Sequence, residues 1–163
     1  MSRLVELNAK IDAFFTRVEN RHGGDMQCAT GCSDCCHTRL TVTGVEAEAI
    51  RAEVATWPTA RRVALTANVA GGPLDRCSAL DPGGRCLIYE ARPVVCRSHG
   101  APIRMRVDSL PVVQSCFRNF TQVTPDADCV IDQETLSTLT LAVDRAAGND
   151  GSRIDLATLL GTM

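Results

Sequence analysis

The sequence predicts a mostly α-helical, small single domain with a β-hairpin and irregular cysteine-rich loops. Three observations predict this class. Apolar residues recur at helical spacing near both ends of the chain, a turn-rich segment with short extended stretches occupies the middle, and nine cysteines are spread from the first loop onward. At 163 residues the chain is long enough to bury one core. We therefore expect one domain over 1–163, with a cysteine-bearing part at 28–118 and flanking helices at 3–22 and 132–160.

The first helix is predicted over 3–22, because seven apolar residues share one face: Leu4, Val5, Leu7, Ile11, Phe14, Phe15 and Val18. Gly23-Gly24 should end it. Thr43-Gly-Val-Glu46 has the pattern of a helix N-terminal capping box, so a second helix should follow it and stop before Trp57-Pro58. We expect Thr59 to cap a third helix.

The middle of the chain should be extended and turning. Leu40-Thr-Val42 is too short to be more than an extended connection. Residues 77–80 and 85–89 flank Asp81-Pro-Gly-Gly84, which predicts a hairpin that brings Cys77 near Cys86. Residues 90–97 should form one helical turn with a proline near its start. Residues 102–107 alternate like a half-exposed strand, and 108–109 should turn.

The net charge and the hydropathy of the chain exclude some classes of binding partner. The formal charge of −2 argues against nucleic acid and against an anionic membrane surface. No apolar run approaches the ~20 residues of a membrane helix. The first residues become polar too soon for a signal peptide. We therefore expect a cytoplasmic protein that binds neither nucleic acid nor membrane.

Cysteines that are clustered as closely as these usually have one role in a reducing cell. Four fall within nine residues, and nine cysteines in all is an odd number, which does not suit a disulfide framework in a reducing cell. Thiolates clustered in this way hold a metal ion or an iron–sulfur cluster, so we expect these loops to bind metal. A second, more widely spaced set should fold back onto the first. The predicted ligands are Cys28, Cys32, Cys35, Cys36, Cys77, Cys86, Cys96 and Cys116.

Cys35 and Cys36 are adjacent, so in an extended loop their side chains should point to opposite sides. They would then not bind one ion in the same way. This predicts two neighbouring metal centres or one polynuclear centre.

A family resemblance supports this ligand set. The cysteine pattern runs Cys28-x3-Cys32-x2-Cys35-Cys36, then Cys77, then Cys86-Leu-Ile-Tyr89-x2-Arg92-Pro93-x2-Cys96-Arg97, then Cys116. This pattern resembles the YkgJ-type cysteine-cluster family (CxxCxxCC), a zinc- or iron-chelating domain. The resemblance covers about 28–118 and implies eight metal-binding cysteines. Cys129 lies outside it and is expected to be a buried structural residue.

The identity of the metal stays open between two chemistries. Clustered thiolates with a distant fourth cysteine are typical of iron–sulfur proteins. We therefore favour an iron–sulfur cluster. Eight thiolates could equally form two four-sulfur zinc sites or hold iron ions. Arg92 and Arg97 flank Cys96 and are the candidates to donate hydrogen bonds to thiolate sulfur. His37 and His99 are weaker ligand candidates, because a loop histidine is more often a surface residue.

Three functions remain open at this point. The first is a non-catalytic metal–thiolate protein in electron transfer, metal handling or redox sensing, with a redox or protein partner. The second is an enzyme, or an enzyme's partner, with an open coordination position on the metal. The third is a structural-zinc module that binds another protein. The sequence offers no Ser/His/Asp set, phosphate loop or dinucleotide fingerprint, so we expect the first.

Overall fold

A computed structural model describes residues 2–163; Met1, at which the expected domain begins, lies outside the described residues. The chain forms two compact units. One contains residues 2–29 and 94–143, and the other contains residues 30–93 and 144–163. Helices hold 51% of the residues and strands 12%, so the prediction of a mostly α-helical protein is confirmed. The assignment of 1–163 to one domain stays a prediction.

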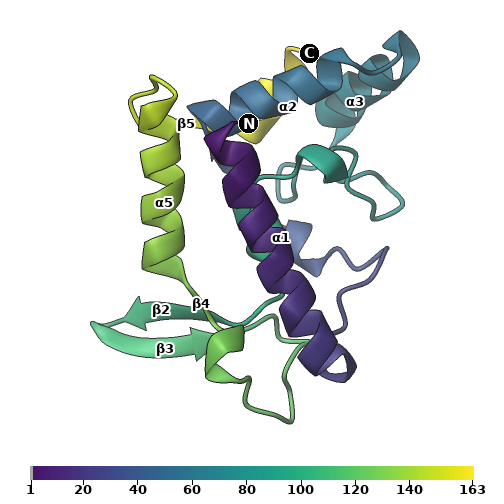
Figure 1. The fold of residues 1–163 in the computed structure, drawn as a ribbon. Helices are drawn as coiled ribbons and strands as arrows, with labels where there is room; N and C mark the ends of the chain where they lie inside the picture. The colour runs from purple at the N-terminus through teal and green to yellow at the C-terminus, as the bar shows by residue number, and fades with distance from the viewer. Residues whose placement is uncertain (1) are drawn as a thin grey trace. The chain divides into compact units, whose positions relative to one another are not determined.

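Helix α1, Arg3–His22, is the main helix of the first unit (Figure 1). It begins after Ser2, whose hydroxyl oxygen accepts the Leu4 N–H at 3.3 Å. Its buried face consists of Leu4, Leu7, Ile11 and Val18, so the predicted helix over 3–22 is confirmed with both of its ends. The short helix α4, Val94–Ser98, packs on α1.

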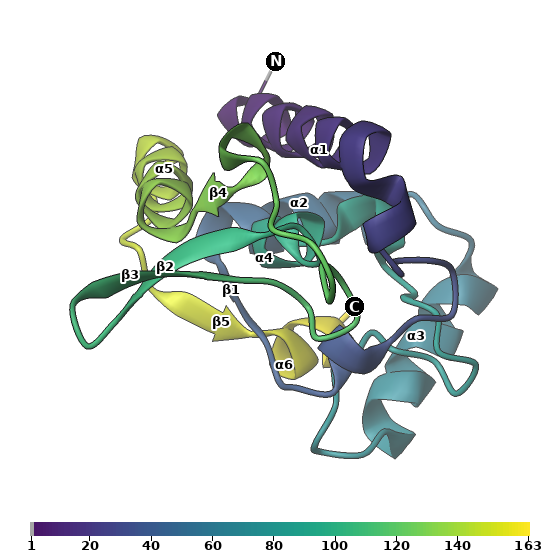
Figure 2. The same cartoon turned by 90° about the horizontal axis from the view of Figure 1, so that it is seen from below.

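The first unit also contains a three-stranded sheet in the order β3-β2-β4 (Figure 2). Strands β2, Ile103–Val107, and β3, Leu110–Gln114, are antiparallel, and β4, Ile131–Asp132, pairs parallel with β2. Asp108 and Ser109 join the first two strands with φ of 49° and 69°, which is typical of a tight hairpin turn. The predicted strand at 102–107 and the turn after it are confirmed.

The second unit is organised around α2, Gly44–Ala55, and α3, Thr59–Gly71. The capping box predicted at the start of α2 is present between Thr43 and Glu46. The expectation that Thr59 caps α3 is wrong, because the helix starts at Thr59 itself with Pro58 in the capping position. Proline fits there because its fixed φ suits the start of a helix.

The two ends of this unit pair as strands. β1, Thr41–Thr43, is antiparallel to β5, Arg153–Asp155. The expectation that 40–42 is only an extended connection is therefore wrong, because its partner lies near the other end of the sequence. The expected helical region 132–160 consists of α5, Gln133–Ala146, then a loop and β5, and then α6, Leu156–Gly161.

The turn-rich segment is less regular than expected. The hairpin predicted at 77–89 has a single bridge, Leu80 to Cys86, supported by the Leu87 N–H donating to Ala79 O at 2.8 Å. The helical turn expected over 90–97 is divided into a 3-10 turn, Tyr89–Ala91, and α4. Pro93 separates them, because the residue before a proline is disfavoured in helical conformation.

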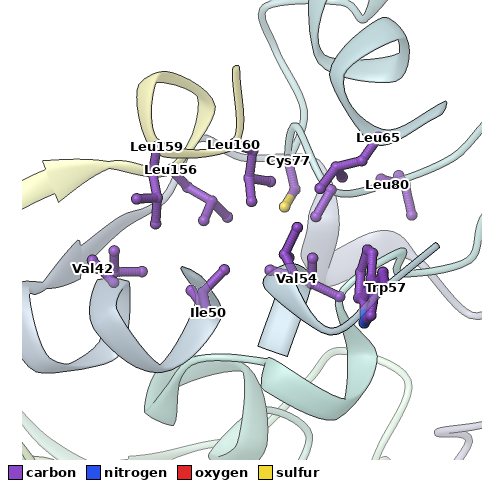
Figure 3. Close-up of a cluster of buried hydrophobic side chains, with 13 residues drawn as sticks. Val42, Ile50, Val54, Trp57, Leu65, Cys77, Leu80, Leu156, Leu159 and Leu160 are labelled. Atoms are coloured by element: carbon purple, nitrogen blue, oxygen red, sulfur yellow. The ribbon is translucent and has the colours of Figure 1, made fainter. Parts of the chain in front are cut away.

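The core of the second unit packs α2, α3 and α6 around the cysteine-bearing segment. Figure 3 shows the Cys77 side chain among Leu65, Leu80 and Leu160, all of which are buried. Cys36 and Cys86 pack against the same core. In the first unit a smaller cluster of Val18, Ala101 and Cys129 is buried. Among the described residues, no helix combines the length and the apolar character needed to cross a membrane.

Candidate metal centre

The nine cysteines divide between the two units. Among the described residues 2–163, none is joined to another by a disulfide. The first unit holds Cys28, Cys96, Cys116 and Cys129, and the second holds Cys32, Cys35, Cys36, Cys77 and Cys86. Each unit therefore combines cysteines of the first loop with cysteines of the later segment.

Cys35 and Cys36 lie on a 3-10 turn, Asp34–Cys36. The Cys36 N–H donates to Ser33 O at 2.8 Å, and the two sulfur atoms are 4.0 Å apart. The expectation that they point to opposite sides of an extended loop is wrong, because the turn curls the backbone so that both thiols face one side. Two thiolates on one tetrahedral metal ion, each about 2.3 Å from it, have sulfurs about 3.8 Å apart. The observed separation is close to that value.

Backbone hydrogen bonds fix the second cysteine segment against this turn. The Cys77 N–H donates to Cys36 O at 2.7 Å, and the Leu80 N–H donates to Cys77 O at 3.0 Å. Leu80 also forms an antiparallel β-bridge with Cys86. The main chain thus carries four thiols, those of Cys35, Cys36, Cys77 and Cys86, into one region at the edge of the core.

These thiols lie close together and are partly shielded from water, and both conditions raise their pKa values. The pKa of the Cys36 thiol is raised, first by its hydrogen bond with Cys35, then by burial and by the charges that Cys35, Cys77 and Cys86 would carry. Burial likewise raises the pKa of Cys77 and that of Cys86. Without a cation these thiols stay protonated at neutral pH.

Donors aimed at sulfur oppose this effect and favour the thiolate. The backbone N–H groups of Ala79 and Leu80 hydrogen-bond to the Cys77 sulfur and act to lower its pKa. The N–H of Ile88 does the same for Cys86, and the Arg92 guanidinium adds a favourable charge there. Such N–H donors to sulfur and a nearby cation stabilise metal-bound thiolates. The donor set therefore fits a thiolate-bound metal.

Cys32 lies on the loop that follows Gly31 and is exposed. This loop approaches the 81–86 turn at Gly84, where an added Cβ would lie 3.4 Å from Gly31 O and 3.5 Å from the Ser33 hydroxyl oxygen. Gly84 also has a φ of +76°, which disfavours other residues. The glycine lets the two cysteine-bearing segments lie close together.

In the first unit Asn119 organises the surroundings of Cys28. Its Nδ2 lies 3.3 Å from the Cys28 sulfur and donates to Gly100 O at 2.8 Å, and its Oδ1 accepts the Gln27 N–H at 2.8 Å. The Asn119 N–H donates to Cys116 O at 2.8 Å, which brings the Cys116 segment to the same residue. Cys96 lies half-buried on α4. Sequence reasoning missed Asn119, because a lone asparagine carries no spacing signal.

The remaining candidates fall in different places. Arg92 lies over the Tyr89 ring at 4.2 Å and contributes a favourable charge near Cys86. Arg97 donates to both oxygens of Asp12 on α1, at 2.9 and 3.2 Å. His37 ends the Cys35–Cys36 turn and is exposed, as is His99. The structure thus places Arg92 beside a predicted ligand and pairs Arg97 with a carboxylate.

One comparison with known proteins identifies a family. The family model named CxxCxxCC, described as a putative zinc- or iron-chelating domain, matches residues 27–129. The match runs beyond the expected end at 118 and includes Cys129, so the expectation that Cys129 lies outside it is wrong. Among curated proteins and among solved structures, the searches found no match. Because the match spans more than half of the chain and all of the clustered thiols, the protein belongs to the CxxCxxCC family of zinc- or iron-chelating domains.

Proposed function

We propose that Cys35, Cys36, Cys77 and Cys86 form one four-thiolate centre for zinc or iron, and that the chain handles this metal without catalysing a reaction. The observation that carries the proposal is the 4.0 Å separation of the Cys35 and Cys36 sulfurs, in a turn hydrogen-bonded to the Cys77 segment. Neighbouring thiolates at this spacing match two ligands of a single ion.

This spacing bears on the kind of centre. In a cluster of four irons each cysteine binds a different iron, so its cysteine sulfurs lie further apart than two ligands of one ion. A single zinc or iron ion places two thiolates on one metal, and so does a two-iron cluster. The geometry at Cys35 and Cys36 therefore favours a single ion or a two-iron cluster.

The surroundings suggest a role in carrying or sensing metal. Cys77 is buried, whereas Cys35 is exposed. In such a centre the exposed Cys35 thiolate can be replaced on the metal by a thiol of a partner protein, or it can be oxidised. Four thiolates fill a tetrahedral ion, which leaves no position for a substrate. This favours storage, delivery or redox sensing, with a redox or protein partner, over an enzyme with an open position on the metal.

The first unit offers Cys28, Cys96 and Cys116, which we propose as a further ligand set. Asn119 would donate a hydrogen bond to sulfur there, as the Ile88 N–H does at Cys86. Thiols of this kind persist in a reducing compartment, and we place the chain in the cytoplasm on that ground.

The deciding experiment is metal analysis of protein purified without oxygen. Zinc, iron and acid-labile sulfide are measured per chain in the wild type, Cys36→Ser and Cys77→Ser. We expect bound zinc or iron, reduced in both variants. Sulfide in amounts equal to iron would assign a cluster, and its absence would assign single ions.

A matched control separates ligand loss from damage to the core. Ala79→Ser places a hydroxyl at a fully buried position two residues from Cys77 and removes no thiol. It should keep its metal even where it loses stability. Equal metal loss in Ala79→Ser and Cys77→Ser would contradict the proposed centre, as would a wild type without metal.

A further inference from the structure

A second kind of metal-binding arrangement lies in the first unit, outside the clustered thiols. One ligand atom from each of His22, Asp126 and Cys129 can be chosen such that all three lie within 4.8 Å of one another. Around a tetrahedral zinc ion, nitrogen, oxygen and sulfur ligands are about 3.3–3.8 Å apart. Small side-chain rotations would therefore bring these three atoms onto one ion.

Local structure explains how these residues meet. His22 is the last residue of α1. Asp126 precedes the 3-10 turn Ala127–Cys129, and the Cys129 N–H donates to Asp126 O at 2.9 Å. Residues three apart in a 3-10 turn lie on the same side, so the Asp126 carboxylate and the Cys129 thiol face the same helix end.

The histidine is oriented as a metal ligand would be. Its Nε2 accepts a long hydrogen bond of 3.4 Å from the Asp126 N–H and lies 3.4 Å from Asp126 Oδ2. Its Nδ1 lies 3.5 Å from Asp25 Oδ2. This geometry assigns the proton to Nδ1, facing the Asp25 carboxylate, and the lone pair to Nε2, facing Asp126. A bound ion would take the place of the long hydrogen bond from the Asp126 N–H. Metal-binding histidines nearly always have such a carboxylate or carbonyl behind them.

The surroundings combine shielding with one open side. Cys129 is fully buried in the cluster with Val18, and the Phe120 ring meets the His22 ring edge-on at 5.3 Å. The Asp126 side chain is 56% exposed, which leaves room for a water molecule as a fourth ligand. One carboxylate and one thiolate would neutralise a divalent ion. Arg21 lies 2.7 Å from Asp128 and 3.6 Å from Asp126 Oδ2, so Asp128 is the nearer partner of its charge.

We propose that His22, Asp126 and Cys129 form a separate site for one divalent transition-metal ion, with Asp25 positioning His22. Nitrogen, oxygen and sulfur ligands together suit zinc or ferrous iron. This site is independent of the four-thiolate centre, since it shares no residue with it. Cys129 is then a ligand and not only a buried structural residue.

The test titrates zinc into the full chain with its thiolate centres already loaded, against a competing chelator, and repeats the titration with Co²⁺ to record its visible spectrum. The wild type should bind one additional zinc ion per chain. Asp126→Asn should lose that ion or bind it at least about ten-fold more weakly, and Asp25→Asn should weaken it by about ten-fold. Cobalt should give a tetrahedral spectrum with a thiolate charge-transfer band that Cys129→Ser abolishes.

Asp128→Asn is the matched control, because Asp128 lies on the same turn, is similarly exposed and is bound to Arg21 rather than to His22. It should keep the additional ion. Equal zinc binding by Asp126→Asn and Asp128→Asn would overturn the proposal, even if Cys129→Ser failed to fold. Cys36→Ser should keep this ion while losing the one at the four-thiolate centre, so failure of either site can be recognised separately.

Discussion

Asn119 Nδ2 lies 3.3 Å from the Cys28 sulfur and 2.8 Å from Gly100 O, so one amide holds a predicted ligand against a neighbouring backbone segment. Asn119 is only 3% exposed, although it is polar. A buried amide is tolerated where its donors and its acceptor are used, and here Oδ1 also accepts the Gln27 N–H. The residue therefore fixes where the Cys28 thiol lies.

Asn119→Ala should destabilise the protein by about 1–3 kcal/mol, because the Gln27 N–H and Gly100 O lose their partner. The free energy of unfolding from urea titration measures this effect. Asn20→Ala, on the exposed side of α1, should change it by no more than about 0.5 kcal/mol. Similar values for both variants would show that the Asn119 contacts contribute little.

Gly100→Ala should disturb Cys28 directly. An added Cβ at Gly100 would lie 2.6 Å from the Cys28 sulfur, and the residue has a φ of +98°. Gly148→Ala is the control, because Gly148 has a φ of +91° and no atom within 4 Å of the added Cβ. Both variants should lose about 1–2 kcal/mol to backbone strain. Only Gly100→Ala should also raise the rate at which a thiol reagent modifies Cys28 in metal-free protein.

Local patterns in the sequence predicted the helices well. The apolar face of α1 and the capping box before α2 are set by residues within one or two turns, so both were found. The pairing of β1 with β5 was missed, because three residues carry no strand signal and the partner is remote in sequence.

The candidate site was predictable in composition but not in arrangement. The spacing of the cysteines indicated metal ligands, and the family match agrees. Neither the 3-10 turn that brings Cys35 and Cys36 to 4.0 Å nor the division of the 28–36 loop between two units is visible in the spacing. His22 and Cys129 meet only because separate elements place a helix end beside a turn, which no local pattern records.

Metal affinity at the four-thiolate centre should rise steeply with pH. The pKa values of Cys36, Cys77 and Cys86 are all raised, so these thiols are protonated at neutral pH and release protons when they bind metal. The logarithm of the zinc affinity, plotted against pH between 6 and 8, should have a slope of about three or more. In Cys77→Ser the slope should fall by about one, and an unchanged slope would count against Cys77 as a ligand.

The metal-free protein should show the opposite trend in stability. A thiol whose folded pKa is raised deprotonates first in the unfolded chain, so the unfolded state binds fewer protons above its pKa of about 8.5. The contribution of Cys77 and Cys86 to the free energy of unfolding is thus fully present below pH ~8.5 and declines as pH rises toward the folded values. Urea titrations of metal-free protein between pH 7 and 10 should show this decline, and a stability that increased over this range would contradict it.

Chelating the metal should loosen the cysteine-bearing part of the second unit far more than α1. Residues 77–88 have one strand bridge and a few turn hydrogen bonds, so bound metal would supply much of their order. Helix α1 has its own hydrogen bonds and a buried apolar face, which metal at the four-thiolate centre does not provide. Amide hydrogen exchange on metal-loaded and chelated protein should therefore show lost protection at 77–88 and little change within α1. Protection that stayed unchanged at 77–88 would mean that apolar packing around Cys77, rather than metal, orders this segment.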